Sequence, residues 1–410
     1  MARPITQGEL SIMRNSRLTA KALGVTNTGL VHLRSLAPMT RRSFAKGALA
    51  AGTLAAGALA AGAAAVGLAG REARAAEAIN YFGWQGYDLV PNAGGFMDQN
   101  GLYLETTYIS TNEEILAAAR AAGKGQMDLV TPMHCFIPLY NQGALLEPLD
   151  LSRIPNIQGL FPEFRNVPEL MKDGQQYALP FAWGALQLMY NADVIAEPPT
   201  AWEDLFMPEY QGKASAVLDV FGVMVPFAAM ATGRKAPTRL TQAELDKTVD
   251  LLIAFKKEHA LTFATYGDLA GLFATGEAII GIASEAVSVW AGPDAPTLKW
   301  MMPELGGNAF LDCWAMIADS PHRDRNYEIL NHILSPEAQA LDAELNAQGV
   351  VVEAAVALLK DTERALYPYD DIGSFFERAG GLTPMYPLEP EGDFVTYDQV
   401  LDGWDKFLSA

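Results

Sequence analysis

Cysteine and histidine are scarce in this sequence. Its 410 residues include two cysteines, Cys135 and Cys313, and five histidines. They form no Cys-x-x-Cys pair and no Cys/His cluster, so neither a metal centre nor a redox site is predicted. We therefore expect no metal and no cofactor. A disulfide between the two cysteines is permitted outside the cytoplasm, but a protein of this size does not need one.

Basic residues are also few. The sequence has 29 Lys and Arg against 48 Asp and Glu, which gives a formal charge of −19. This balance argues against nucleic acid, or an anionic membrane surface, as a partner. No arginine occurs between Arg165 and Arg234, which disfavours a receptor for an anion. The length leaves room for two domains and a processed leader.

One long stretch near the beginning carries no charge. Residues 47–70 hold twelve Ala and six Gly among 24 positions, so the stretch is long enough for a bilayer but only mildly hydrophobic. The preceding MTRRSFAK, which begins at Met39, resembles a twin-arginine export signal, and Ala73-Arg74-Ala75 offers a signal peptidase site. We predict a leader over 1–75, with Met39 as the true start and cleavage near Ala75. A retained membrane anchor is the alternative.

Such a leader exports a folded protein. We therefore expect the twin-arginine translocase as a partner and the periplasm as the location. Residues 1–75 carry ten Lys and Arg against two Asp and Glu, so their removal leaves a body with a charge of about −27.

The remaining chain alternates between short apolar strands and helices. This alternation, with short loops, predicts parallel, doubly wound sheets. Ligands in such sheets lie beyond the carboxyl ends of the strands, where Trp84 and the loop 132–136 are expected. The pattern predicts strands at 79–82, 102–109, 128–131, 187–190, 279–282 and 309–318, and helices at 112–122, 240–259, 334–345 and 352–359.

Seven segments, in order from residue 79 to about 350, carry a family likeness. They resemble the polyamine-type periplasmic receptors, which bind spermidine and putrescine and have the type 2 periplasmic-binding fold. The segments are INYFGWQGY at 79–87, TNEE at 111–114, DLVTP at 128–132, LPFAWG at 179–184, WEDLFMPEYQG at 202–212, FATGEA at 273–278 and DCWAM at 312–316.

The resemblance implies an α/β fold of two doubly wound lobes joined by a hinge. Each lobe is expected to combine two stretches of chain: 76–184 with about 287–335, and 185–286 with about 336–410. In such receptors the lobes close on a small organic solute, and this motion signals to an ABC permease in the inner membrane. We expect this receptor to act as a monomer.

The resemblance also implies a site for a cationic solute. Trp84 and Tyr87 match an aromatic pair that stacks on the ligand, where each ring attracts a cation by roughly 0.5–2 kcal/mol. Asp312 matches a carboxylate that pairs with an amine, although a Lys or Arg of the fold could equally be its partner. The aromatic pair could instead cover the edge of the lobe.

Other positions depart from the family pattern. Ser284 stands where the family has a tryptophan, and Glu285 beside it is a possible substitute carboxylate. Asp219 alone remains of an Asp/Glu pair, and Met133 and Cys135 replace a polar loop. Because a linear diamine needs an anion at each end, we predict a small amine-bearing solute, polyamine-like but not necessarily putrescine or spermidine.

An exported enzyme is the alternative prediction. A thiamin-degrading enzyme of this fold uses a cysteine in its cleft, activated by a glutamate, and Cys135 with Glu285 or His134 could act in that way. The residues around Cys135 match no such motif, and a buried loop cysteine is usually inert packing. We therefore predict a binding protein without catalytic residues.

Overall fold

The computed structural model describes residues 76–410, with the backbone alone for 260–264. The predicted export signal, the start at Met39 and the cleavage near Ala75 lie outside the described residues. The described residues belong to one compact unit. Across residues 76–410, the structure has no helix that is both long and apolar enough to cross a membrane.

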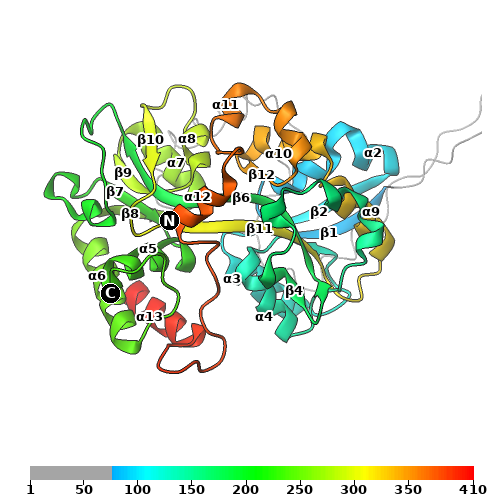
Figure 1. Ribbon diagram of the computed structural model, residues 1–410, viewed down its shortest axis with the longest axis horizontal. Helices are drawn as coiled ribbons and strands as arrows, with labels where there is room; N and C mark the ends of the chain where they lie inside the picture. The colour runs from blue at the N-terminus through cyan, green and yellow to red at the C-terminus, as the bar shows by residue number, and fades with distance from the viewer. Residues whose placement is uncertain (1–75) are drawn as a thin grey trace, which may run out of the picture. The chain divides into compact units, whose positions relative to one another are not determined.

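Two groups of parallel strands form the ends of one large sheet (Figure 1). In each group two strands pair in parallel with a third that lies between them, as expected for doubly wound sheets. The first group is β1 (Glu77–Gly83), β2 (Leu102–Tyr108) and β3 (Leu129–Val130), and the second is β7 (Ala214–Val217), β8 (Ala260–Ala264) and β9 (Ile280–Ala283).

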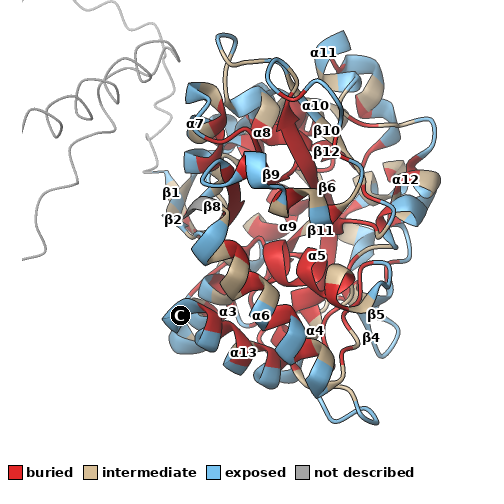
Figure 2. Ribbon diagram, turned by 90° about the vertical axis from the view of Figure 1, so that its left-hand side faces the viewer, coloured by how far each residue is buried: buried red, intermediate tan, exposed pale blue. Residues whose placement is uncertain are grey.

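Two antiparallel strands join these groups. β6 (Ala178–Asn191) pairs with β11 (Asn308–Met316) along most of its length and with β9 near its end. All of β6 is buried, in the red interior of Figure 2, and a strand covered on both faces is typically a continuous apolar run. The order is β2-β1-β3-β11-β6-β9-β7-β8, and β10 (Leu298–Met301) and β12 (Gly349–Val350) also pair with β6. β6 and β11 are therefore the connection between two lobes.

Helices surround each group of strands (Figure 1). Around the first group lie α2 (Phe96–Asn100), α3 (Asn112–Ala122), α4 (Ile137–Gln142), α9 (Arg323–His332) and α10 (Pro336–Asn346). Around the second group lie α5 (Val220–Thr232), α6 (Gln242–Glu258), α7 (Tyr266–Thr275), α8 (Glu285–Trp290) and α13 (Tyr397–Ser409). Two short helices, α11 (Asp361–Arg364) and α12 (Ile372–Ala379), and the hairpin of β4 (Met171–Lys172) and β5 (Gln175–Gln176) complete the regular elements named in Figure 1. The chain also forms short 3-10 helices, among them η1 (Tyr87–Gly95), η2 (His134–Phe136), η6 (Pro168–Leu170) and η9 (Glu353–Leu358).

Capping residues fix the two best-predicted helices. α3 begins after Thr111, whose hydroxyl accepts the Glu114 N–H at 3.2 Å, while the Glu114 carboxylate accepts the Thr111 N–H. α6 begins after Thr241 with the same reciprocal arrangement. This capping box satisfies N–H groups that a helix start leaves unpaired. The segment predicted as helical at 352–359 forms the 3-10 helix η9.

The C-terminal part of the chain packs on both lobes. α10 lies against η1 and β12, beside the first group of strands, whereas α13 lies against α6 in the second. The predicted boundaries assign everything after about 336 to the second lobe, and the position of α10 favours the first lobe for that helix. The boundaries as a whole stay a prediction.

Candidate ligand-binding site

Asp312 stands at an irregularity in the strand that joins the lobes. The register of β11 against β6 shifts between Asp312 and Cys313, and Asp312 also forms an isolated bridge with Met133. A bulge of this kind turns a side chain away from its regular direction. The Asp312 carboxylate accepts a hydrogen bond from the Tyr87 hydroxyl, with 2.8 Å between Oδ2 and Oη.

The loop after β1 holds both predicted aromatic residues and brings Tyr87 to this carboxylate. Tyr87 is buried and meets Phe181 of β6 edge-on, with ring centroids 5.0 Å apart. Trp84 is half-buried, and its Nε1 is buried without a hydrogen-bond partner. The turn needs glycine at position 86, where φ is 99° and a Cβ atom would lie 2.0 Å from Asn346 Oδ1.

Asp219 approaches from the second lobe. It precedes α5, and its Oδ1 accepts the Phe221 N–H at 3.1 Å, as an N-cap residue does. Its Oδ2 accepts the Tyr266 hydroxyl at 3.1 Å. The charge of Asp219 acts on Asp312, which brings these two predicted residues within electrostatic reach of each other.

Two further carboxylates belong to the same region. Glu113, in the first turn of α3, accepts a hydrogen bond from the Tyr397 hydroxyl at 2.6 Å, and the charge of Asp219 contributes to raising its pKa. Asp342 of α10 is fully buried and accepts a hydrogen bond from Asn346 Nδ2 at 2.8 Å, and the charge of Asp312 contributes to raising its pKa. We call Glu113, Asp219, Asp312 and Asp342 the carboxylate cluster.

Sequence reasoning missed two members of the carboxylate cluster. Glu113 stands in the first turn of α3, where acidic residues are common whatever their function, so its position carries no separate signal. Asp342 carried a detectable signal: it lies four residues from both Ala338 and Asn346, on the buried stripe of α10. A charged residue on an apolar helical stripe indicates either a buried partner or a site.

Burial raises the pKa of every carboxyl group in the carboxylate cluster. The pKa of Asp312 rises to about 7, with the charge of Asp219 adding to the effect of burial. Burial raises the pKa of Asp342 to about 7 and that of Glu113 to about 7, and it also raises that of Asp219. Ionising these groups together is therefore costly unless a positive charge joins them.

No Lys or Arg of the described part of the chain forms an ion pair with the carboxylate cluster. Within residues 76–410, the Lys and Arg ion pairs all use other carboxylates. Asp342 Oδ2, although buried, has no hydrogen-bond partner. A buried carboxylate without a partner costs several kcal/mol by order of magnitude. The alternative in which a Lys or Arg of the fold neutralises Asp312 therefore gains no support.

Ser284 and Glu285 follow β9, and the charges of Glu285 and Asp342 both act on Tyr367. Ser284 and Glu285 are buried at the end of β9 and the start of α8. Glu285 Oε1 accepts a short hydrogen bond from Gln187 Nε2 on β6, and burial raises the pKa of Glu285 to about 8. Among the described residues, no hydrogen bond or ion pair joins Glu285 to the carboxylate cluster. The structure therefore joins Tyr87 to Asp312 by a hydrogen bond and brings Asp219 within electrostatic reach of Asp312, whereas Glu285 pairs with Gln187.

The loop after β3 is packed rather than open. Met133 is buried, and its N–H donates to Asn112 Oδ1 at 2.8 Å. Cys135 is fully buried, and desolvation raises the pKa of its thiol well above the usual value. His134 Nδ1 accepts the Leu311 N–H at 3.3 Å, and burial lowers the pKa of this histidine to about 4. Both Cys135 and Cys313 are free thiols.

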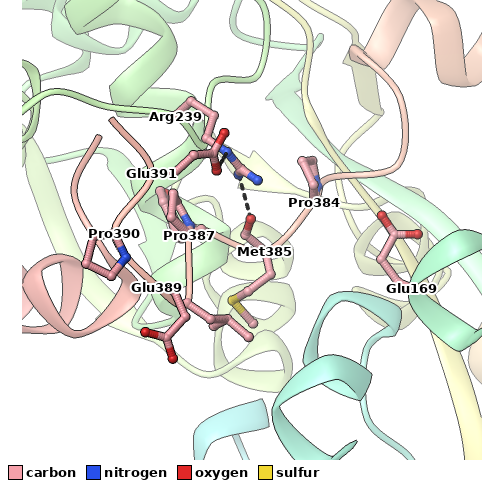
Figure 3. A pocket seen from close by; sticks show the side chains of 10 residues that line it. Glu169, Arg239, Pro384, Met385, Pro387, Glu389, Pro390 and Glu391 are labelled. Atoms are coloured by element: carbon pink, nitrogen blue, oxygen red, sulfur yellow. Dashed lines mark hydrogen bonds and ion pairs between the residues drawn. The ribbon is translucent and has the colours of Figure 1, made fainter. Parts of the chain in front are cut away.

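The carboxylate cluster does not have the arrangement of a metal site. In the part of the chain that the structure describes, no three His, Cys, Asp or Glu side chains are arranged to hold a metal ion. Two surface hollows, of about 460 Å³ and 260 Å³, lie elsewhere and include none of the carboxylate cluster. Figure 3 shows the larger one, where Glu169 faces the loop 384–391 and Arg239 donates to the Met385 carbonyl.

Comparison with known families identifies the class of protein. The bacterial extracellular solute-binding protein family matches residues 93–359, and the chain belongs to this family. The predicted resemblance and the two-lobed α/β fold are confirmed. The chain is thus a binding receptor of the kind that serves ABC importers, and the enzyme alternative finds no support among its relatives.

Several individual proteins of known name or structure are similar to this chain. The spermidine/putrescine-binding periplasmic protein of Salmonella typhimurium is 24% identical over 310 residues, covering 73% of this chain and 86% of the relative. The putrescine-binding periplasmic protein PotF of Escherichia coli is 23% identical over 327 residues, covering 74% and 86%. The Tp0655 (TpPotD) lipoprotein of Treponema pallidum has a similar structure, with a TM-score of 0.66 at 18% identity over 81% of this chain and 98% of that one.

Proposed function

We propose that this protein is a periplasmic receptor for a small linear solute with two or more ammonium groups, which it delivers to an ABC permease in the inner membrane. The observation that carries the proposal is the carboxylate cluster, in which Asp219 and Asp342 are buried and Asp312 and Glu113 half-buried. Within residues 76–410 none of the four forms an ion pair with Lys or Arg, and the cluster has members from both lobes. Several curated relatives bear the names of putrescine or spermidine binding proteins, which favours the same ligand class.

The geometry suits an extended cation better than a compact one. Asp219 and Asp312 lie on opposite lobes, so a ligand with separated ammonium groups could pair with both at once. Trp84 and Tyr87 would cover its methylene chain and add cation–π attraction. In a closed cleft without bulk water, these contacts are stronger than on an open surface.

The ligand contacts remain proposals. We propose direct contact for Trp84, Tyr87, Asp219 and Asp312, with Asp342 as an additional negative charge beneath the aromatic loop. The ligand-binding roles predicted for Met133, Cys135, Ser284 and Glu285 stay predictions.

The test is a panel of ligands against the purified protein. Putrescine and spermidine at 100 times their Kd should raise the melting temperature by about 5 °C, through mass action on the folded state. Glycine betaine, a sugar and a dicarboxylate serve as controls. Stabilisation by the sugar or dicarboxylate alone would overturn the proposal. Native mass spectrometry of the same sample reports any retained ligand and checks the expected monomer.

Export through the twin-arginine route is also our proposal, supported by the sequence that begins at Met39. Changing Arg41→Lys together with Arg42→Lys should abolish export. The resemblance to a twin-arginine signal implies that this route requires both arginines. Cell fractionation followed by immunoblotting measures this loss, and Arg71→Lys, at the end of the same predicted leader, is the matched control. Undiminished export of the double variant would contradict the proposal.

A further inference from the structure

A hydrogen bond joins the two lobes next to the carboxylate cluster. The Tyr397 hydroxyl donates to Glu113 Oε1 at 2.6 Å. Glu113 belongs to α3, which follows β2 in the first group of strands, whereas Tyr397 begins α13, which packs on α6 in the second. The bond therefore crosses from one lobe to the other.

Aromatic rings surround this bond and also cross between the lobes. Phe136 of η2, in the first lobe, meets Phe221 of α5 edge-on with ring centroids 5.4 Å apart. Phe136 also meets the Tyr397 ring at 6.2 Å and 89°. Tyr386 lies tilted against Phe221 at 5.4 Å and stacks on Tyr397 at 6.4 Å. Aromatic rings thus cover the Tyr397 side of the hydrogen bond, which makes the bond stronger than one in open water.

The same residues lie beside the proposed ligand contacts. Phe221 follows Asp219 by two residues and donates its N–H to that carboxylate. Asp219 also acts on Glu113 through its charge. The lobes cannot part at Asp219 without separating Phe136 from Phe221 and Glu113 from Tyr397.

We infer that Glu113 and Tyr397, with the rings of Phe136 and Phe221, form an interlobe clasp that holds the cleft closed and sets how long a bound solute is retained. The inference rests on the proposed receptor function for its ligand. Glu113 and Tyr397 are positioning residues, because they act through closure rather than by touching the solute. The C-terminal helix is thereby part of the binding mechanism.

The first variant is Tyr397→Phe, which removes the hydroxyl and keeps the ring. Spermidine should dissociate about tenfold faster, because a hydrogen bond to a charged group is lost. The association rate should not fall, because a more open unliganded cleft leaves the entry of the ligand unhindered. Stopped-flow fluorescence measures both rates, and Tyr103→Phe, at an exposed tyrosine, is the matched control.

A double-mutant cycle separates the clasp from a general loss of packing. Glu113→Ala should speed dissociation as much as Tyr397→Phe, and the double variant no more than either one alone. Glu113→Gln, which keeps an acceptor oxygen, should have a smaller effect. Additive effects of the two single variants, or an unchanged dissociation rate, would overturn the inference.

A measurement on the unliganded protein tests the interlobe clasp independently of the proposed receptor function. Spin labels at Asn100→Cys and Lys257→Cys, on exposed parts of α2 and α6, report the distance between the lobes. Both native cysteines are buried, which favours selective labelling. Tyr397→Phe should shift the unliganded distribution toward longer distances. A shift without any spermidine binding would refute the receptor proposal alone, and an unchanged distribution would refute the clasp.

Discussion

Asp312→Asn is expected to weaken the binding of putrescine or spermidine by at least about 30-fold. Removing one partner of a desolvated charge pair typically costs about 2–5 kcal/mol, and each 1.4 kcal/mol is tenfold in affinity. Asparagine has nearly the same shape, and its oxygen can still accept the Tyr87 hydroxyl. The loss should therefore come from the charge. Isothermal titration calorimetry at pH 8, where the carboxyl group is ionised in the wild type, measures it.

The same substitution should stabilise the unliganded protein at pH 8. It removes a negative charge that burial and Asp219 both disfavour. A loss of affinity together with a gain in melting temperature cannot be explained by damage to the fold. The matched control is Asp250→Asn, at an exposed position of α6, which should change neither quantity. Unchanged affinity in Asp312→Asn, or a lower melting temperature, would contradict this prediction.

The elements that the sequence predicted well are those with local signals. The helix at 112–122 and the one near 240–259 carry capping residues, and the short strands carry apolar runs. α5, by contrast, was not predicted. Its sequence VFGVMVPFAAMAT has no polar face and contains Pro226, so it shows no helical periodicity. It is a helix because tertiary packing buries it on nearly all sides.

The residues of the candidate site also fall into those with a local sequence signal and those placed by tertiary packing. Tyr87 and Asp312 were predicted from recognisable segments, and a hydrogen bond joins them in the structure. The pairing of Glu285 with Gln187 was not predictable, because Gln187 lies 98 positions earlier in the chain.

The packing partners that bury the carboxylate cluster could not be predicted from the sequence. Asp342 is buried because α10 packs on η1, far away along the chain. No local pattern encodes that contact. Burial, rather than residue type, is what raises the pKa of Asp342 and makes it part of the carboxylate cluster.

Binding should strengthen steeply as the pH rises from 5.5 to 8. Burial raises the pKa of Asp312, Asp342 and Glu113 each to about 7, whereas carboxyl groups in an unfolded chain lose their protons near pH 4. Aliphatic amines stay protonated throughout this range. A cation that pairs with the ionised forms must therefore displace protons, and affinity should rise by up to about tenfold per pH unit for each carboxyl group involved.

The unliganded protein should show the opposite trend. Between about pH 4 and 7 the folded state binds more protons than the unfolded chain, so its stability falls as the pH rises through this window. Melting curves at several pH values test this, and calorimetry at pH 6.5 in buffers of different ionisation enthalpy counts the protons released on binding. Asp312→Asn should release fewer protons than the wild type. A flat affinity between pH 5.5 and 8, or proton uptake on binding, would show that the carboxylate cluster does not meet the ligand, because its protons would then stay in place.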